Sequence, residues 1–197
     1  MHYPKFFDEI DTVTLKDPLA ELLGAFDAGL VTFSYLDAVK QAGHSCPTVA
    51  GAYLMTLYGL KALYGDATPV RGEIEVFFKE DMQEGVAGVI GNVISLITGA
   101  TDKSGFKGLG GKFARHSLMH FQTDIPGSVR FRDKQSGKSV DVTYDPSAVA
   151  GDPKQQMLMQ KIMQNSANAE ERAEFGRLWQ NRVEAIMKNP DTVIGVS

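Results

Sequence analysis

Cysteine, histidine and tryptophan are scarce in this sequence, and no apolar run is long. Its 197 residues include one cysteine, four histidines and one tryptophan. The single cysteine, Cys46, excludes a disulfide within the chain and any zinc finger built from four cysteines. The longest apolar segment, residues 85–100, has about sixteen residues, short of the roughly twenty that cross a bilayer. We therefore expect no membrane partner.

A large charge of one sign is also missing. The 20 basic and 24 acidic residues give a net charge of −4, which does not indicate a nucleic-acid partner. Residues 1–17 carry acids and no long apolar run, so they do not look like a secretory signal. We therefore expect a reduced, cytoplasmic protein. Its length and its hydrophobic content of 43% predict one globular core over residues 1–150, followed by an extension over 151–197.

The most informative segment present is Ala42–Pro47, which precedes an apolar run. Proline is favoured at the first position of a helix, so Pro47 predicts a helix over residues 47–64 with Cys46 as its N-cap. The positive end of the helix dipole favours the thiolate, the form of cysteine that reacts and binds metals. His44 and Cys46 are close enough in the chain to bind one metal ion together, and both are candidate catalytic residues. The alternative is that Cys46 is a small buried apolar residue.

Two protein ligands are too few for a structural zinc site, which has four. Residues 113–122 alternate as a strand, which would place His116 and His120 on one face. Because they would lie about 13 Å apart, only one of them can join His44 and Cys46. We choose His116, with His120 and Asp102 as alternatives. Such a divalent metal site, with zinc preferred to iron, keeps a position open for water or substrate.

Alternating and helical patterns predict an α+β fold. An antiparallel sheet of residues 72–79, 113–122, 128–133 and 138–144 is expected to cover the two apolar helices 47–64 and 85–97. Residues 134–137 are expected to form a hairpin loop. Asp17 and Ser34 are expected to begin two further helices, the first burying Leu19, Leu22, Leu23 and Phe26.

Residues 98–112 are rich in glycine and lysine. Backbone N–H groups together with Lys107 and Lys112 are candidates for holding a phosphate or carboxylate of a cofactor. The segment lacks the spacing of the known phosphate-binding loops, since Phe113 stands where such a loop needs serine or threonine. A flexible lid or a plain connection is the simpler interpretation.

The composition changes after residue 151. A methionine-rich helix and then an amphipathic helix are expected, with Phe175, Leu178, Trp179, Val183, Ile186 and Met187 among the stripe of the second. Methionines at helical spacing are far more often core or a partner surface than a soft-metal site. We expect this extension to pack on the core or on a second copy in a homodimer.

The sequence Gly43-His44-Ser45-Cys46-Pro47 resembles the signature of the FmdE family, which is named for a subunit of formylmethanofuran dehydrogenase. The similarity extends over roughly residues 35–145 and includes Thr98, Gly99 and Thr101. Many related sequences carry a second cysteine where this chain has Ala100, and many end in a cysteine-rich zinc-binding tail that this chain lacks. A dithiol site is therefore not expected.

The resemblance implies a zinc- or iron-binding protein or enzyme linked to one-carbon or redox metabolism. His44 and Cys46 would form its site, and Thr98, Gly99 and Thr101 would belong to a cofactor-binding element with a small-molecule substrate or cofactor nearby. The family's association with a molybdenum- or tungsten-dependent complex leaves open whether this chain is an enzyme. Two alternatives remain: an accessory module that binds a haem or pterin, and a structural interaction module in which Cys46 is inert.

Overall fold

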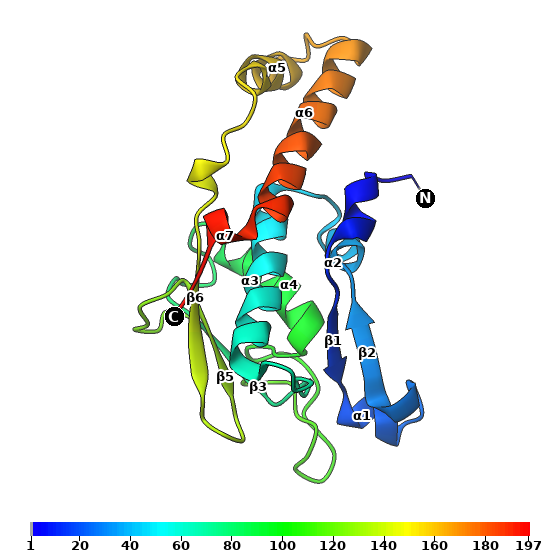
Figure 1. Cartoon of the computed structure of the whole chain (residues 1–197), viewed down its shortest axis with the longest axis vertical. Coiled ribbons are helices and arrows are strands. Elements are labelled where there is room, and N and C mark those ends of the chain that lie inside the picture. Colours follow the sequence, from blue (N-terminus) through cyan, green and yellow to red (C-terminus); the bar gives the residue numbers. More distant parts are fainter. Residues whose placement is uncertain (1) are drawn as a thin grey trace.

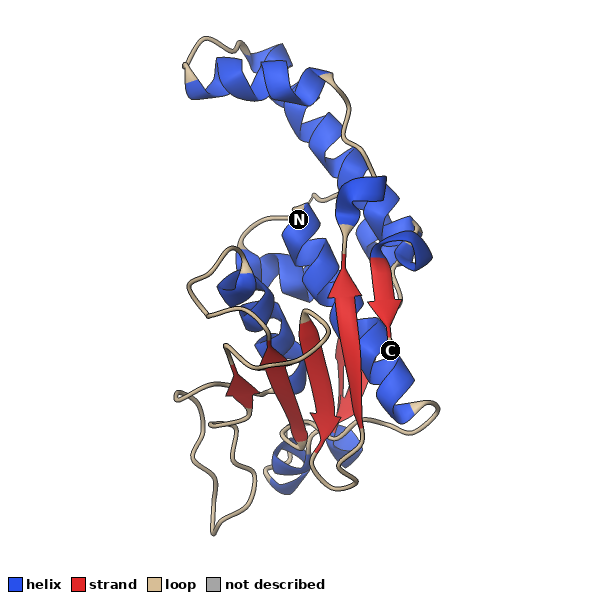
Figure 2. Ribbon diagram, turned by 90° about the vertical axis from the view of Figure 1, so that its left-hand side faces the viewer, coloured by secondary structure: helices blue, strands red, loops and turns tan. Residues whose placement is uncertain are grey.

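The computed structural model describes residues 2–197, which form a five-stranded sheet and a layer of helices (Figure 1). Across the sheet the strands are β4 (Met119–His120), β3 (Ile74–Phe78), β5 (Val129–Asp133), β6 (Ser139–Tyr144) and β7 (Ile194–Val196). Neighbouring strands are antiparallel except β3 and β4, which are parallel. The long helices lie on one face of the sheet (Figure 2). The expected α+β class is confirmed.

The two expected apolar helices are present as α3 (Pro47–Tyr64) and α4 (Ala87–Thr98). Helix α3 lies at the centre of the molecule, where it packs against α4, the sheet and the long helix α6 (Ala169–Lys188). The side chains of Ile74, Val76 and Phe78 point into this core, whereas Glu75 and Phe77 between them are only half-buried. This alternation, expected for residues 72–79, is what a sheet with one covered face requires.

Helix α3 approaches the sheet closely because glycine occupies two positions on its inner face. A Cβ atom at Gly59 would lie 2.6 Å from Cδ2 of Phe131 on β5. A Cβ atom at Gly51 would overlap the ring of Tyr144 on β6. The aromatic rings therefore fill the space that larger helix residues would occupy.

The expected strand over residues 113–122 is wrong for most of its length. Only Met119 and His120 join the sheet, and they pair in parallel with β3. The backbone has positive φ at Phe113, Ser117 and Gln122, with values of 62°, 56° and 56°. Left-handed residues interrupt an extended chain, so the apolar alternation does not produce a continuous strand. His116 consequently lies outside the sheet.

At the N-terminus, β1 (Val13–Lys16) and β2 (Leu30–Phe33) form a separate antiparallel hairpin. Asp17 caps the short helix α1 (Pro18–Leu22) at the tip of this hairpin, as expected. The expected burial of Leu22, Leu23 and Phe26 is wrong, because these side chains are 61%, 67% and 49% exposed. Helix α1 ends after five residues at the tip of the hairpin, too short to carry a whole apolar face onto the core.

Helix α2 (Tyr35–Ala42) links the hairpin to the motif. Its expected capping box is confirmed: the Ser34 hydroxyl accepts from the backbone N–H of Asp37, and the Asp37 carboxylate accepts from the backbone N–H of Ser34. The helix ends at Gly43, whose φ of 77° is left-handed. The chain then runs directly into residues 44–46 and α3.

The C-terminal segment contains α5 (Lys154–Met163), α6 (Ala169–Lys188) and α7 (Pro190–Val193), and then β7. The second half of α6 buries Val183 and Ile186 against the core. Helix α5 and the first half of α6 form an arm that projects from the body of the molecule (Figure 2). Strand β7 was not expected, because three residues are too few to show an alternating pattern.

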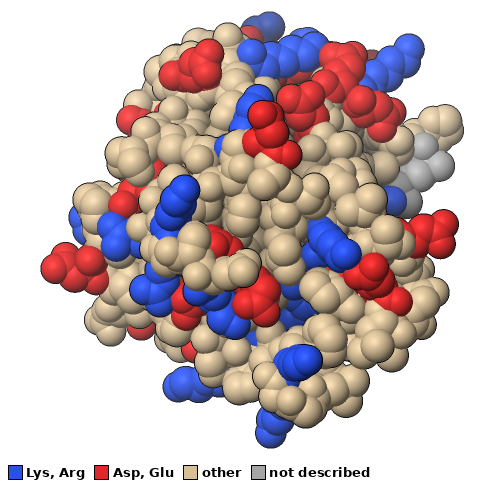
Figure 3. All heavy atoms as spheres, turned by 60° about the horizontal axis from the view of Figure 1, so that its bottom comes forward, with Lys and Arg blue, Asp and Glu red and all other residues tan. Residues whose placement is uncertain are grey.

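Positive and negative side chains are interspersed over the face shown in Figure 3. Within residues 2–197, no helix combines the length and the apolar character that a membrane crossing requires.

The close approach of α3 to the sheet predicts opposite effects for two glycine substitutions. Gly59→Ala should lower the free energy of unfolding by about 2 kcal/mol, since the new methyl group meets the ring of Phe131. Gly176→Ala on α6, where nothing lies within 4 Å, should raise it by about 0.5–1 kcal/mol through helix propensity. Urea unfolding followed by circular dichroism measures both. Equal effects of the two changes would contradict the close contact.

Candidate functional site

The residues of the Gly-His-x-Cys-Pro motif form a short connector between two helices. Gly43 ends α2, and Pro47 begins α3. Cys46 has extended backbone angles and is the N-cap of α3, as the sequence predicts. Its Sγ accepts the backbone N–H of Val49 at 3.5 Å, and its side chain is half-buried. The thiol therefore lies at the positive end of an 18-residue helix.

The imidazole of His44 is exposed and oriented by the backbone. Its Nδ1 lies 3.0 Å from the carbonyl oxygen of Ala42. A carbonyl can only accept, so Nδ1 carries the proton and Nε2 keeps a lone pair. Metal-binding histidines commonly have one ring nitrogen held in this way. His44 and Cys46 thus place an imidazole and a thiol, two side chains of types that bind metals, on the same connector.

Ser45, between these two residues, is buried and fixed by the C-terminal helix. Trp179 Nε1 and Gln180 Nε2, both on α6, donate to its carbonyl oxygen at 3.0 and 3.2 Å. Its hydroxyl is 2.9 Å from the hydroxyl of Tyr35 on α2. From the sequence, Trp179 was expected only as part of an apolar stripe. A tryptophan keeps a polar N–H that needs a partner when the ring is buried, which was the available signal.

Two tyrosines flank the connector. The hydroxyl of Tyr144 on β6 donates to the carbonyl oxygen of Pro47 at 2.7 Å. Burial raises the pKa of both Tyr35 and Tyr144 well above the ordinary value, and the negative charge of a Cys46 thiolate raises both further. The two phenols therefore remain protonated at neutral pH and hold the connector by hydrogen bonds.

The remaining candidate ligands lie elsewhere in the fold. His116, half-buried in the loop before β4, has Nδ1 3.0 Å from the Ser117 hydroxyl. His120 stacks on Phe77 on the outer face of the sheet, with ring centroids 4.7 Å apart. Among residues 2–197, no three His, Cys, Asp or Glu side chains are grouped so as to hold one metal ion. Within the described residues, neither His116 nor His120 therefore forms a three-residue group with His44 and Cys46.

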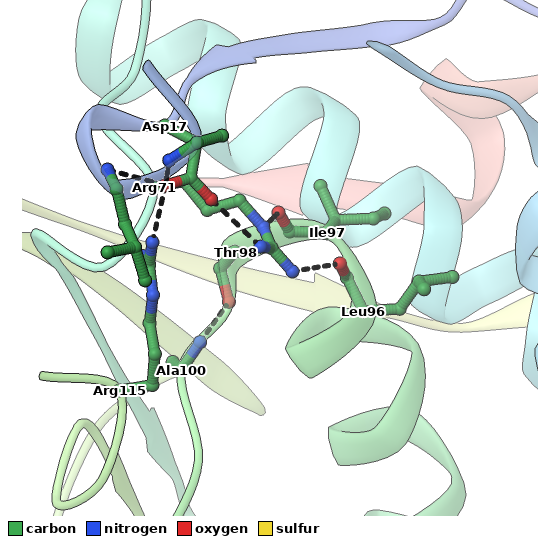
Figure 4. A network of polar contacts seen from close by, with 9 residues as sticks. Asp17, Arg71, Leu96, Ile97, Thr98, Ala100 and Arg115 are labelled. Atoms are coloured by element: carbon green, nitrogen blue, oxygen red, sulfur yellow. Dashed lines mark hydrogen bonds and ion pairs between the residues drawn. The ribbon is translucent and has the colours of Figure 1, made fainter. Parts of the chain in front are cut away.

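In the Thr98–Thr101 element, Thr98, Gly99 and Ala100 are buried, and Figure 4 shows Thr98 and Ala100 beside a cluster of charged side chains. The Thr98 hydroxyl donates to the carbonyl oxygen of Ile94 at 2.8 Å and accepts the N–H of Ala100 at 3.2 Å. Gly99 is buried and ends α4 with a φ of 74°. In this structure the polar atoms of the Thr98 side chain bond to the protein's own backbone.

A buried charge cluster surrounds this element. Asp17 accepts from Arg71 Nη1 at 3.0 Å and from Arg115 Nη2 at 2.7 Å. Arg71 also donates to the carbonyl oxygens of Ile97 and Leu96, each at 3.0 Å. Figure 4 shows these contacts converging on the end of α4. From the sequence, Asp17 was expected only as a helix cap, and neither arginine was identified.

Thr101 and Asp102 border a cleft of about 490 Å³ on the outer side of α4. The hydroxyl of Thr101 donates to the carbonyl oxygen of Arg115 at 2.9 Å and also contacts that of Ser104. The other polar residues of the cleft are Asn92, Ser95 and Ser104, and its apolar residues include Val89, Met119 and Phe121.

Lys107 and Lys112 are exposed in the loop that follows. This loop makes a tight turn in which Leu109 and Lys112 exchange backbone hydrogen bonds. Neither lysine is among the residues that line the cleft. The structure thus separates the candidate cofactor residues into a buried pair (Thr98 and Gly99), a cleft residue (Thr101) and two exposed lysines.

Together these features define an α+β protein with a histidine and a cysteine displayed at the N-terminus of its central helix. The chain belongs to the FmdE family, described as "FmdE, Molybdenum formylmethanofuran dehydrogenase operon", whose sequence model matches residues 42–195. The match starts at the motif and continues through α5 and α6 into β7. It therefore extends further than the similarity over residues 35–145 that was expected from the sequence. No curated protein matches the chain.

The charge cluster predicts a pH-dependent contribution of Asp17 to stability. Burial alone would raise its pKa, but hydrogen bonds from Arg71 and Ala20 and the charge of Arg115 lower it below the ordinary value. A carboxylate with a lowered folded-state pKa stabilises the fold above its unfolded pKa, and this contribution is lost as pH falls through the folded pKa. Asp17→Asn should therefore cost about 3 kcal/mol at pH 7 and progressively less below about pH 4.

Urea unfolding at pH 7, 4 and 3 measures this difference. Asp124→Asn, at an exposed carboxylate, is the matched control and should cost less than about 0.5 kcal/mol. A cost for Asp17→Asn that stays constant over this pH range would contradict the assigned ionisation.

The bonds from α6 to Ser45 predict that α6 controls access to the Cys46 thiol. Gln180→Leu removes one donor to the Ser45 carbonyl, so the connector should open more often and alkylation by iodoacetamide should be about fivefold faster. Trp179→Phe should act in the same direction. Asn181→Leu, at an exposed neighbouring position, should leave the rate unchanged. Unchanged rates in both test variants would show that α6 does not fix the connector.

Proposed function

We propose that this FmdE family chain binds one divalent metal ion through Nε2 of His44 and Sγ of Cys46, with zinc preferred to iron. The carrying observation is the bond between His44 Nδ1 and the Ala42 carbonyl, which leaves Nε2 as the ligating nitrogen beside a thiol at a helix N-cap. Imidazole and thiolate are ligands that both metals accept. The residues present therefore fit the metal that the family resemblance implies.

A metal held by two residues keeps positions for other ligands. No three potential ligands are grouped within residues 2–197, so His116, the third ligand predicted from the sequence, does not join the pair in this arrangement. Water or a small-molecule substrate would complete the coordination. A metal with an open position supplies Lewis-acid or water-activating chemistry. In that role His44 and Cys46 would hold the metal next to the reacting group, and the connector would keep both side chains in place. We place such a substrate in one-carbon or redox metabolism, as the family description suggests.

We further propose that the protein is a homodimer formed through the arm of α5 and α6. Leu158 and Leu178 are buried within the arm, but Met157 and Met163 remain 51% and 69% exposed. Exposed methionines on a projecting element are typical of a partner surface. The same α6 that forms the arm also holds Ser45, so the partner surface is connected to the metal-binding connector through one helix.

The cleft on the outer side of α4 favours a second function, an accessory module that binds a cofactor. The cleft has a volume of about 490 Å³ and is lined by apolar side chains together with the polar residues Asn92, Ser95, Thr101 and Asp102. This mixture suits a flat ring with polar edges, such as a pterin. A haem fits less well, because neither His44 nor Cys46, its expected axial contacts, lines this cleft.

Elemental analysis of the purified protein tests the first proposal. The parent should hold about one zinc or iron per chain, and this content should fall strongly in His44→Ala and in Cys46→Ala. His2→Ala, at an exposed histidine outside the connector, is the control, and His116→Ala tests the third ligand. Trp179, the only tryptophan, should report zinc addition by a change in fluorescence, because its Nε1 bonds to Ser45 beside Cys46.

Equal metal in the parent and in Cys46→Ala would contradict the metal site. An absorbance spectrum of the same samples separates the alternatives: a bound chromophore in a metal-free parent would support the cofactor module. Colourless, metal-free protein with Cys46 unreactive to iodoacetamide would contradict both the metal site and the cofactor module. The interaction module would then be the remaining interpretation.

A further inference from the structure

A second cleft, of about 270 Å³, lies between the first turns of α3 and α4 and the covered face of the sheet. Pro47 and Thr48 form one wall, and Val86, Ala87 and Ile90 form the opposite wall. Neither His44 nor Cys46 lines it, so an inference drawn from this cleft does not depend on the metal site.

The inner end of this cleft is apolar and closed by buried side chains. Its floor consists of Met55, Phe78 and Val129, each no more than 2% exposed. Tyr144, at one side, already uses its hydroxyl to donate to the carbonyl oxygen of Pro47. A cavity of about 150 Å³ lined by similar side chains accepts a benzene molecule, so this cleft has room for a ring and a short chain.

The lining of the cleft includes one charged side chain. Among the described residues that line it, Glu80 alone is charged, and its side chain is exposed. A carboxylate beside an apolar cavity favours a cation over an anion, because only the cation gains a charge-assisted hydrogen bond there. The apolar end favours a ligand with a ring or alkyl group, and Glu80 favours a cationic group on that ligand.

We propose that this cleft binds small primary amines with an aromatic or branched alkyl body. The ring or alkyl group lies against Pro47, Val86 and Ile90, above the buried Met55, and the ammonium group donates to the Glu80 carboxylate at the mouth. 2-Phenylethylamine has the required size and charge and serves as the probe. With so few atoms to bury, a dissociation constant on the order of 1 mM is expected.

Methionine methyl groups provide a local readout of binding in the full chain. With the methyl groups labelled with carbon-13, titration with 2-phenylethylamine should shift the Met55 signal in a saturable way. The signals of Met82 and Met119 should not shift, because these residues line the other cleft. 3-Phenylpropionate, an anion of similar shape, should bind more weakly.

Variants at the mouth separate the two parts of the proposal. Val86 borders both clefts, whereas Val89 borders only the first. Val86→Trp should therefore abolish the Met55 shift by closing the mouth, and its control Val89→Trp should leave the shift intact. Both valines are exposed, at 47% and 38%, so both variants should fold. Glu80→Gln should weaken the amine about two- to fivefold and leave 2-phenylethanol unchanged.

Several results would overturn the proposal. The first is that Met55 shows no saturable shift at amine concentrations up to 20-fold above the expected dissociation constant, on the order of 20 mM. The second is that Val86→Trp and Val89→Trp reduce the Met55 shift equally. Binding of 3-phenylpropionate as tight as that of the amine would overturn the role of Glu80. His44→Ala should bind the probe like the parent, so failure of the metal site leaves this inference standing.

Discussion

Asp17 carries a buried negative charge that the guanidinium groups of Arg71 and Arg115 share, and the structure around the Thr98 element depends on this cluster. Buried charges are costly unless they are paired, and one carboxylate offsets only one of the two cations. The second positive charge is met by the carbonyl oxygens of Leu96 and Ile97, at the negative end of α4. The cluster thereby joins the N-terminal hairpin, the segment before β3, the end of α4 and the loop before β4.

This arrangement changes how the Thr98–Thr101 element is understood. Thr98 and Gly99 are buried beside the cluster, and a side chain at Gly99 would meet Arg115. The element therefore fixes the end of α4 and orients Thr101 toward the outer cleft. A cofactor bound in the cleft would contact Thr101 and its neighbours. Thr98 would not contact it, because the Thr98 hydroxyl bonds to backbone groups at the end of α4.

The sequence predicted those parts of the fold that depend on local signals. The Cys46 cap, the Ser34 capping box and the alternation of residues 72–79 each follow from a few neighbouring side chains, and all are confirmed. Residues 113–122 alternate just as clearly, but left-handed backbone at Phe113 and Ser117 breaks the strand, and no local signal marks those positions. The pairing of Asp17 with Arg115 joins residues 98 positions apart, which one sequence cannot show. The bond from Trp179 to Ser45 is equally long-range.

That long-range bond is central to the proposed function, because residues 44–46, which carry His44 and Cys46, are then held by α2, α3 and α6 together. Extended X-ray absorption fine structure of the zinc-loaded protein tests the ligand pair most directly. Ligation by His44 and Cys46 predicts one sulfur at about 2.3 Å and nitrogen or oxygen ligands at about 2.0–2.1 Å, with the sulfur shell lost in Cys46→Ala. A shell of nitrogen and oxygen alone in the parent protein would contradict it.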